Sequence, residues 1–264
     1  MNAKETLHTH PQLELKEIIN AIVKKYPLSL QEKWDESGIR YVPPKFNAVT
    51  GVLLCLDIDK TAIEVALRND INLIISHHPI FTENKDYKMS KYDKEILASL
   101  KANKIAFVSY HTNVDNSPIG LSYYIAKELN LQRIQNIGKN GIVTGSLNTA
   151  NRAKVFGGII KNKFSLERII FHNVDSVKNI AICAGAGFDI IKGQLDKLNK
   201  IDLFVTADLK YHDWKFAKKH GLQFMDIGHD VENVFLDLIT NLLIEEFKTI
   251  KIQKVYSKTE VLVG

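Results

Sequence analysis

Hydrophobic residues along this chain follow two patterns, one with helical spacing and one with short continuous runs. Ile18, Ile22 and their neighbours recur every three or four positions, which predicts an amphipathic helix over residues 12–26 that ends at Pro27. Residues 52–56 are instead apolar without interruption. Such a run is typical of a strand that is buried on both faces of a parallel sheet.

The two patterns then alternate along the rest of the chain. Further strands are predicted at residues 71–75, 105–110, 168–172, 178–183, 202–206 and 222–227. Helices are predicted at residues 61–69, 91–101, 119–129, 151–161, 189–198 and 231–247. This order of strand, helix and strand predicts an α/β fold with mostly parallel sheets.

A segment rich in Asn and Gly, residues 131–150, interrupts the alternation and indicates a seam between two halves. We therefore expect two intimately joined α/β lobes, an N-terminal one over residues 1–130 and a C-terminal one over residues 131–264. The length of 264 residues fits either two lobes or one large unit.

Composition excludes several classes of protein. With 45% hydrophobic and 25% charged residues, the chain is neither disordered nor a small disulfide-stabilised domain. Its net charge of +5 is mild and Lys is much commoner than Arg, so nucleic-acid binding is possible but not favoured. Cys55 and Cys183 lie in apolar runs and are interpreted as buried thiols. No apolar stretch is long enough to cross a bilayer and no signal peptide is recognised, so we expect a cytoplasmic protein.

Histidines and acidic residues gather directly after the predicted strands. In open α/β sheets, ligands bind outside the carboxyl ends of the strands, where loops from different strands converge. The residues at these positions are His77, His78, His111, Asp115, His229 and Glu232. Any single histidine can be an ordinary hydrogen-bonded residue, but the group as a whole indicates a metal site.

The adjacent pair His77 and His78 favours two ions rather than one. Neighbouring residues of an extended segment face opposite ways, and Pro79 keeps His78 extended. The candidate ligands are His77, His78, Asp115, His229 and Glu232. This mixture of nitrogen and oxygen donors suits zinc, iron, manganese or nickel better than calcium. Two divalent ions with two carboxylates and a bridging hydroxide keep a small positive charge, which favours an anionic, phosphorylated substrate.

Other polar residues near the strand ends have less specific interpretations. Asp57 and Asp59 are predicted to cap the following helix. Asp208 and His212 either orient metal ligands or form a turn. The glycines in residues 185–187 predict a tight turn from strand to helix, with phosphate binding at the helix N-terminus as the alternative.

Several of these motifs resemble one protein family. They are Ile-Ile-Ser-His-His-Pro at residues 74–79, His-Thr-Asn-Val-Asp at 111–115, and the segments 206–212 and 226–229, with the Trp34-Asp35 loop and the glycine-rich turn at 181–187. On these motifs the chain resembles the GTP cyclohydrolase I type 2 homolog family, dinuclear-metal proteins related to the NGG-interacting factor. The resemblance covers nearly the whole chain, in the short form of the family.

The resemblance implies a two-lobed α/β protein with a two-metal site between the lobes, assembled as a ring-shaped homohexamer. It carries the family's ligand positions to His77, His78, Asp115 and His229. The family pattern places a glutamate four residues after the last histidine, where this chain has Asn233, while Glu232 stands three residues after. We expect Glu232 to be the ligand because a position between two cations favours negative charge; with Asn233 there, one metal would bind weakly.

The function that the resemblance implies is that of a metal-dependent hydrolase similar to GTP cyclohydrolase, in which a metal-activated water attacks a nucleotide or another phosphorylated substrate. His111 is the candidate for proton transfer or ligand orientation, with His212 behind it. The alternatives are a different two-metal hydrolase, a metal-binding regulatory or scaffold protein without turnover, and a ring that encircles nucleic acid.

Overall fold

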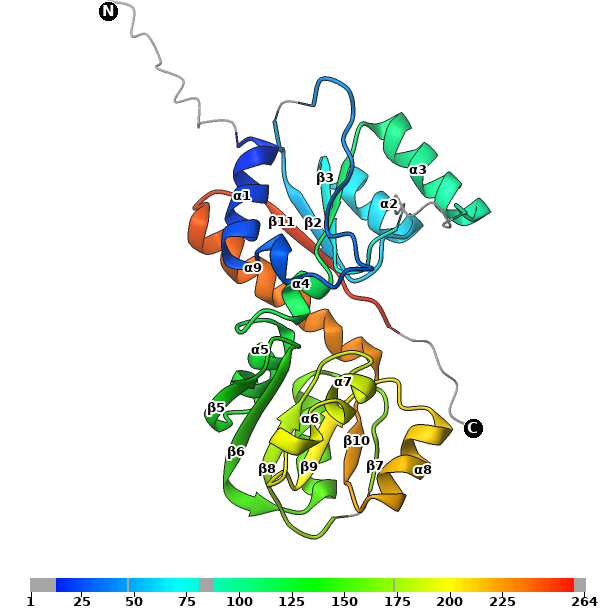
Figure 1. The fold of residues 1–264 in the computed structure, drawn as a ribbon. Coiled ribbons are helices and arrows are strands. Elements are labelled where there is room, and N and C mark those ends of the chain that lie inside the picture. Colours follow the sequence, from blue (N-terminus) through cyan, green and yellow to red (C-terminus); the bar gives the residue numbers. More distant parts are fainter. Residues whose placement is uncertain (1–12, 47, 81–87, 173, 259–264) are drawn as a thin grey trace, which may run out of the picture.

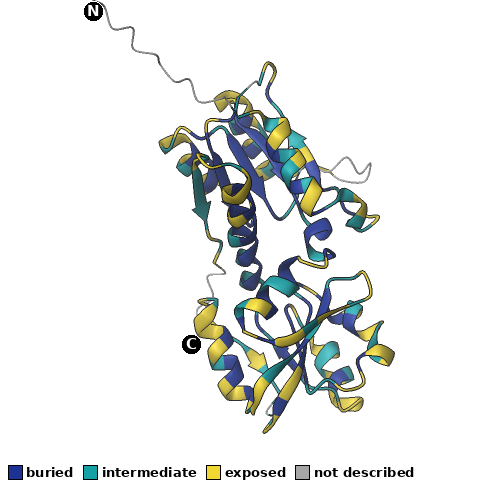
Figure 2. Ribbon diagram, turned by 90° about the vertical axis from the view of Figure 1, so that its left-hand side faces the viewer, coloured by how far each residue is buried: buried dark blue, intermediate teal, exposed yellow. Residues whose placement is uncertain are grey.

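The structure is a computed structural model that describes residues 13–46, 48–80, 88–172 and 174–258. These residues form two sheets with helices packed against them, so the α/β class predicted from the sequence is confirmed. Figure 1 shows the sheets in two lobes, with helix α9 (Val234–Glu246) passing between them. Buried residues follow the strands of both lobes (Figure 2).

The first lobe is built on a five-stranded sheet with the order β1-β4-β3-β2-β11. Its strands are β1 (Gly38–Tyr41), β2 (Val52–Cys55), β3 (Leu73–Ser76), β4 (Ala106–Ser109) and β11 (Ile252–Val255). All neighbouring pairs are parallel except β1 with β4. This sheet has the mostly parallel arrangement that the apolar runs predict.

Helices cover both faces of the first sheet, which explains why its strands are apolar throughout. Leu54 faces a core shared with α1 and α9, whereas Leu53 faces a second core formed with α2 and α3. The helices of this part are α1 (Leu15–Lys25), α2 (Lys60–Arg68), α3 (Lys91–Asn103), α4 (Thr112–Asp115) and the 3₁₀ turn η1 (Leu28–Leu30).

The second lobe is built on a six-stranded sheet with the order β5-β6-β8-β9-β10-β7. Its strands are β5 (Gln132–Ile137), β6 (Ile142–Asn151), β7 (Ile170–Phe171), β8 (Val177–Ile182), β9 (Leu203–Thr206) and β10 (Phe224–Asp226). Its helices are α5 (Leu121–Glu128), which packs against β5, β6 and β8, α6 (Ala153–Lys163), α7 (Phe188–Lys192), η2 (Leu195–Lys197) and α8 (Tyr211–Lys219) (Figure 1).

This second sheet is mixed rather than mostly parallel. Only β8, β9 and β10 run parallel to one another, while β5, β6 and β7 pair antiparallel with their neighbours. Two of the antiparallel pairings involve a hairpin of β5 and β6, which lies in the segment that the sequence indicated only as a seam. Gly138 and Gly141, at φ values of 69° and 67°, allow the tight turn between β5 and β6.

The chain crosses between the lobes more than once. It first passes to the second lobe between α4 and α5, and β5 then begins the second sheet at Gln132. After β10 it continues through the 3₁₀ turn η3 (His229–Asn233) into α9, and β11 then completes the first sheet beside β2. Helix α9 packs against α1, α5 and β2, so it ties the lobes together. Among the described residues, no helix has the length and hydrophobicity to cross a membrane.

Candidate metal centre

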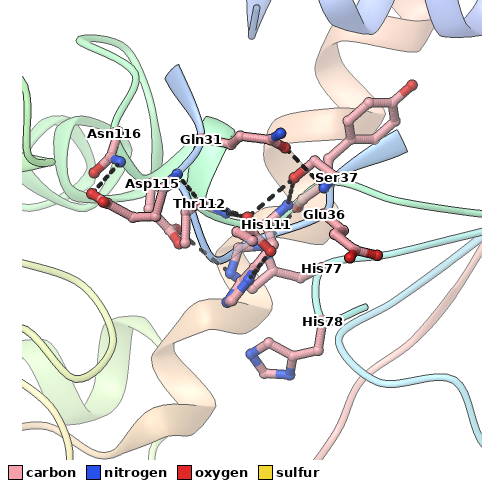
Figure 3. A network of polar contacts seen from close by, with 12 residues as sticks. Gln31, Glu36, Ser37, His77, His78, His111, Thr112, Asp115 and Asn116 are labelled. Atoms are coloured by element: carbon pink, nitrogen blue, oxygen red, sulfur yellow. Dashed lines mark hydrogen bonds and ion pairs between the residues drawn. The ribbon is translucent and has the colours of Figure 1, made fainter. Parts of the chain in front are cut away.

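Histidines and carboxylates from both lobes converge where the parallel strands end. The contributing segments follow β2 (Asp57), β3 (His77, His78), β4 (His111, Asp115), β9 (Asp208) and β10 (His229, Glu232). Two groups of residues could each hold a metal ion, because the possible ligand atoms within each group lie within 4.8 Å of one another. One group is His77, His78 and His111, and the other is His78, His229 and Glu232, so His78 belongs to both. The clustering that the sequence predicted is therefore present. Figure 3 shows the first of these groups, with Asp115 close by.

His77 presents a bare ring nitrogen to the cluster. Its Nδ1 lies 2.9 Å from the backbone oxygen of Tyr110, and because a carbonyl only accepts, Nδ1 must carry the hydrogen. Burial lowers the pKa of His77 to about 3, so the ring is neutral. Its Nε2 is buried and has no hydrogen-bond partner among the described residues. The lone pair on Nε2 is thus available to a cation.

Asp115 faces this bare nitrogen. Its Oδ1 lies 3.5 Å from His77 Nε2 and is likewise buried without a hydrogen-bond partner in the described part of the chain. Burial and the negative charge of Glu232 raise the pKa of Asp115 above its usual range. Buried polar atoms are normally satisfied. Two unsatisfied electron-pair donors facing each other therefore fit a metal ion.

The carboxylate of Glu232 contacts histidines from both lobes. Its Oε2 lies 3.0 Å from His78 Nε2, 2.8 Å from His229 Nε2 and 3.7 Å from His77 Nε2. Burial alone would raise the pKa of Glu232, but the hydrogen bonds from His229 and His78 hold it below its usual range. Glu232 therefore stays ionised, as a carboxylate shared between cations must.

Asn233, the alternative for this position, points elsewhere. Its amide nitrogen donates to the backbone oxygens of Asp230 and Ser257, and its oxygen accepts from the Ser257 backbone N–H at 3.0 Å. The reason lies in local geometry, because residues 229–233 form a 3₁₀ turn. In such a turn, side chains three residues apart lie on the same side, which brings Glu232 beside His229.

Each of the four cluster histidines has its Nδ1 held by an oxygen. His78 Nδ1 lies 2.8 Å from Asp57, His111 Nδ1 lies 3.0 Å from Asp35 and His229 Nδ1 lies 2.5 Å from Asp208. Such contacts fix the ring and leave Nε2 for a metal, the usual arrangement around histidine ligands.

The contacts of these histidine rings decide the roles of several aspartates, and some of these roles differ from those predicted from the sequence. Asp59 does cap α2, accepting from the Ala62 N–H at 2.6 Å, whereas Asp57 orients His78 instead of capping. Asp208 orients His229, one of its two predicted roles. The role of Asp35 was missed; its signal is its place in the Trp34-Asp35 motif.

The two predicted catalytic histidines occupy different places. His111 lies within the cluster beside His77 and His78, so it is a possible metal ligand as well as a proton carrier. The structure does not bring His212 into the cluster. This residue is exposed on α8, with its ring against that of Tyr211 at 5.4 Å between centroids.

Gly185 is required for Glu232 to reach its position. A Cβ on Gly185 would lie 2.2 Å from Glu232 Oε1, and the residue has a φ of +68°. The glycines of this turn therefore allow a close approach between backbone and side chain, as the tight-turn interpretation predicts. Helix α7 after the turn has only five residues.

A pocket of about 380 Å³ borders the cluster at His229 and Asp208. Its other charged lining residues are Glu167, Arg168, Asp226 and Asp230. The pocket offers room for part of a small molecule directly beside the candidate ligands. Its lining contains more carboxylates than cations, so it favours hydrogen-bond donors over phosphate.

Asp57 and Asp59 provide a matched pair of substitutions. Asp57→Asn is expected to lower metal affinity about 10–100-fold, because His78 loses the carboxylate that orients its ring. Asp59→Ala is expected to cost about 0.5–2 kcal/mol of stability through the lost cap, with metal affinity unchanged. Competition with a chromophoric chelator and thermal unfolding measure the two effects. Equal metal affinity in both variants would contradict the role of Asp57.

Comparisons with known proteins agree with the resemblance seen in the sequence. The family model described as Duf34/NIF3 (NGG1p interacting factor 3) matches residues 13–260. A "GTP cyclohydrolase 1 type 2 homolog" of Ureaplasma parvum is 32% identical over 234 residues, covering 86% of this chain and 88% of the relative.

Solved structures show the same fold. A Staphylococcus aureus hypothetical protein superimposes with a TM-score of 0.85 at 24% identity, over 96% of this chain and 99% of the other. A Bacillus cereus protein related to NIF3 gives a TM-score of 0.83 at 20% identity, with the same coverage.

Proposed function

This chain belongs to the Duf34/NIF3 family, and on that premise we propose that it is a metal-dependent hydrolase acting on a nucleotide or another phosphorylated substrate. The observation that carries the proposal is the pair of buried, unsatisfied atoms, His77 Nε2 and Asp115 Oδ1, beside the shared carboxylate of Glu232. The names of curated relatives point to GTP as the first substrate to test.

The residues that would hold two divalent ions are His77, His78, Asp115, His229 and Glu232, with His111 within reach. Zinc, iron, manganese and nickel all suit these donors. Ions bound there would supply a water molecule with a lowered pKa as the nucleophile. The carboxylates of Asp57, Asp35 and Asp208 hold the imidazole rings in place during this chemistry.

His111 is proposed to move a proton as well as to line the site. Its Nδ1 lies 3.0 Å from the buried carboxylate of Asp35, which fixes the orientation of the ring. The hydrogen bonds from His111 and Thr112 hold the pKa of Asp35 below its usual range, although burial alone would raise it. Asp35 therefore remains an anion that orients His111, in the way that a carboxylate orients a catalytic histidine.

The test is an assay of metal-loaded protein with GTP. Release of formate would show attack on the purine imidazole ring, whereas release of phosphate alone would show a phosphatase or nucleotidase. The control is His78→Ala, which removes the ligand common to both groups. Stoichiometric metal without turnover of GTP or any phosphoester would overturn the hydrolase proposal in favour of a metal-binding regulatory protein. The homohexameric ring and the cytoplasmic location stay predictions.

Metal affinity is expected to rise with pH. Burial opposes a charge on His78, but hydrogen bonds to Asp57 and Glu232 raise its pKa to about 10. The hydrogen bond to Glu232 raises the pKa of His229 to about 9. Both rings are thus protonated at neutral pH and must lose protons to bind metal. Between pH 6 and 8, affinity should increase by about one to two log units per pH unit, one for each proton released. Chelator competition at several pH values measures this slope, and a flat profile would contradict it.

A further inference from the structure

We propose that Trp34 is a stacking platform for a planar heteroaromatic ring of the substrate, such as a purine base, at the edge of the metal centre. The inference rests on the proposed function, because it names the class of substrate that this site takes. It assigns binding of the ring to one residue outside the candidate ligands.

The exposure of Trp34 is the first observation. The residue is 68% exposed, although tryptophan is highly buried on average in folded proteins. A large apolar ring left in water gains free energy when another ring covers it. Trp34 therefore has an open surface available for a ligand.

The second observation is the place of that surface. The indole ring lies edge-on to the ring of His111, with 5.8 Å between centroids. His111 in turn lies 5.1 Å from His77 and 5.5 Å from His78, measured in the same way. The His111 imidazole therefore lies between a ring stacked on Trp34 and the candidate ligands His77 and His78. This spacing is short enough for the rest of the same molecule to enter the cluster.

The third observation is that the loop carrying Trp34 is fastened on both sides. The buried carboxylate of Asp35 accepts from His111, from the Thr112 backbone N–H at 2.9 Å and from the Thr112 hydroxyl at 2.5 Å. The Glu32 backbone N–H donates to the same hydroxyl, and Ser37 Oγ accepts from the His111 backbone N–H at 3.0 Å. Figure 3 shows Ser37 and Thr112 on either side of His111. These hydrogen bonds fix the loop that carries the indole before a ligand binds, so little conformational entropy is lost on binding.

The chemistry of an indole selects for a flat ring rather than for charge. Stacking of a base on an aromatic side chain corresponds to about a 5- to 150-fold gain in affinity, and it needs no particular pattern of donors and acceptors. A phosphate gains nothing from the indole face. The base therefore binds at Trp34, and the part of the molecule that reacts, either the imidazole edge of the base or the attached phosphates, lies toward His77 and His78.

Fluorescence can test this directly because the chain has only two tryptophans, Trp34 and Trp214. Trp214 is half-buried in the second lobe and lies against His172, so Trp214→Phe leaves Trp34 as the sole tryptophan reporter. In the zinc-loaded protein, GTP and guanosine are expected to quench the emission of the Trp214→Phe variant. Inorganic tripolyphosphate is expected to leave it unchanged. Trp34→Phe, which retains Trp214, should show no quenching with any of the three.

Affinity measured by calorimetry provides the second readout. Trp34→Leu should bind guanosine and GTP about 5- to 150-fold more weakly, while Trp34→Phe keeps most of the affinity. Binding of GTP without any change in Trp34 emission, or no binding of GTP and guanosine to the wild-type protein, would overturn the proposal. So would a Trp34→Leu variant that changes the mass of the assembly but binds guanosine normally, because Trp34 would then be a contact between copies.

The outcome separates this inference from the hydrolase proposal. Quenching by guanosine in a protein that turns over nothing supports the stacking site and overturns the hydrolase. Turnover of GTP with the same KM in Trp34→Leu and wild type supports the hydrolase and overturns the stacking site. A rise in KM with little change in kcat is the result expected if both hold.

Discussion

Glu232→Gln is expected to lower metal affinity by about 100-fold or more, beyond the range that loss of an orienting contact produces. The carboxylate lies within 3.7 Å of the Nε2 atoms of His77, His78 and His229, so one substitution removes the one carboxylate that contacts all three rings in the described part of the chain. Glutamine has nearly the same shape, which limits the effect on packing. Elemental analysis after dialysis and chelator competition measure the loss.

The matched control for this substitution is the neighbouring residue. Asn233→Ala removes hydrogen bonds to Asp230 and Ser257, and it should cost about 1 kcal/mol of stability while leaving metal content intact. The opposite result, with metal lost in Asn233→Ala and retained in Glu232→Gln, would show that the residue four positions after His229 is the ligand. It would also show that the 3₁₀ turn rearranges when metal binds.

Gly185→Ala is expected to damage both the fold and the metal site. The residue has a left-handed backbone conformation, in which a side chain costs about 1–2 kcal/mol. The added methyl group would also lie 2.2 Å from Glu232 Oε1, so the carboxylate must move away from His78 and His229. We expect a lower melting temperature together with at least about a 10-fold loss of metal affinity, as for other changes that displace a ligand.

Gly158→Ala is the control for this glycine substitution. Gly158 lies in the middle of α6 with helical geometry, and a Cβ there would meet no described atom within 4 Å. Alanine should therefore stabilise the protein by about 0.4–1 kcal/mol and leave metal affinity unchanged. Thermal unfolding and metal titration of the two variants give the comparison. Wild-type metal affinity in Gly185→Ala would mean that Glu232 does not hold metal in the position described.

The sequence predicts those parts of the fold whose hydrophobic pattern is strong. Residues 52–56 and 71–75 are apolar because helices cover both faces of the first sheet, and the strands lie there as predicted. Strands β5 and β11 were missed because their residues are exposed or half-buried, which leaves no clear period. Helix α8 was missed for the same reason, since Ala217 is its only buried residue.

The candidate site could be predicted from the order of the strand ends, but its finer geometry could not. His77, His78, Asp115, His229 and Glu232 gather because parallel strands end at the same edge. Asp57 and Asp59 look equivalent in the sequence. The path of the chain after β2 determines that Asp57 contacts the His78 ring and that Asp59 caps helix α2.

The choice between Glu232 and Asn233 likewise depends on local backbone geometry. The turn after Gly228 is 3₁₀ rather than α-helical, which hydrophobic spacing cannot reveal over five residues. His212 was predicted from its motif, and its place on an exposed helix face became visible only in three dimensions.

The pairing of β11 with β2 has a consequence for biosynthesis. During translation β2 leaves the ribosome early, whereas its neighbour β11 is made only after the whole second lobe. Until then the nascent first sheet has an open edge of unpaired backbone groups on a strand that is entirely apolar. Release of an incomplete polypeptide would leave that edge open to association with other chains, so this protein is expected to depend on chaperones when its synthesis stalls.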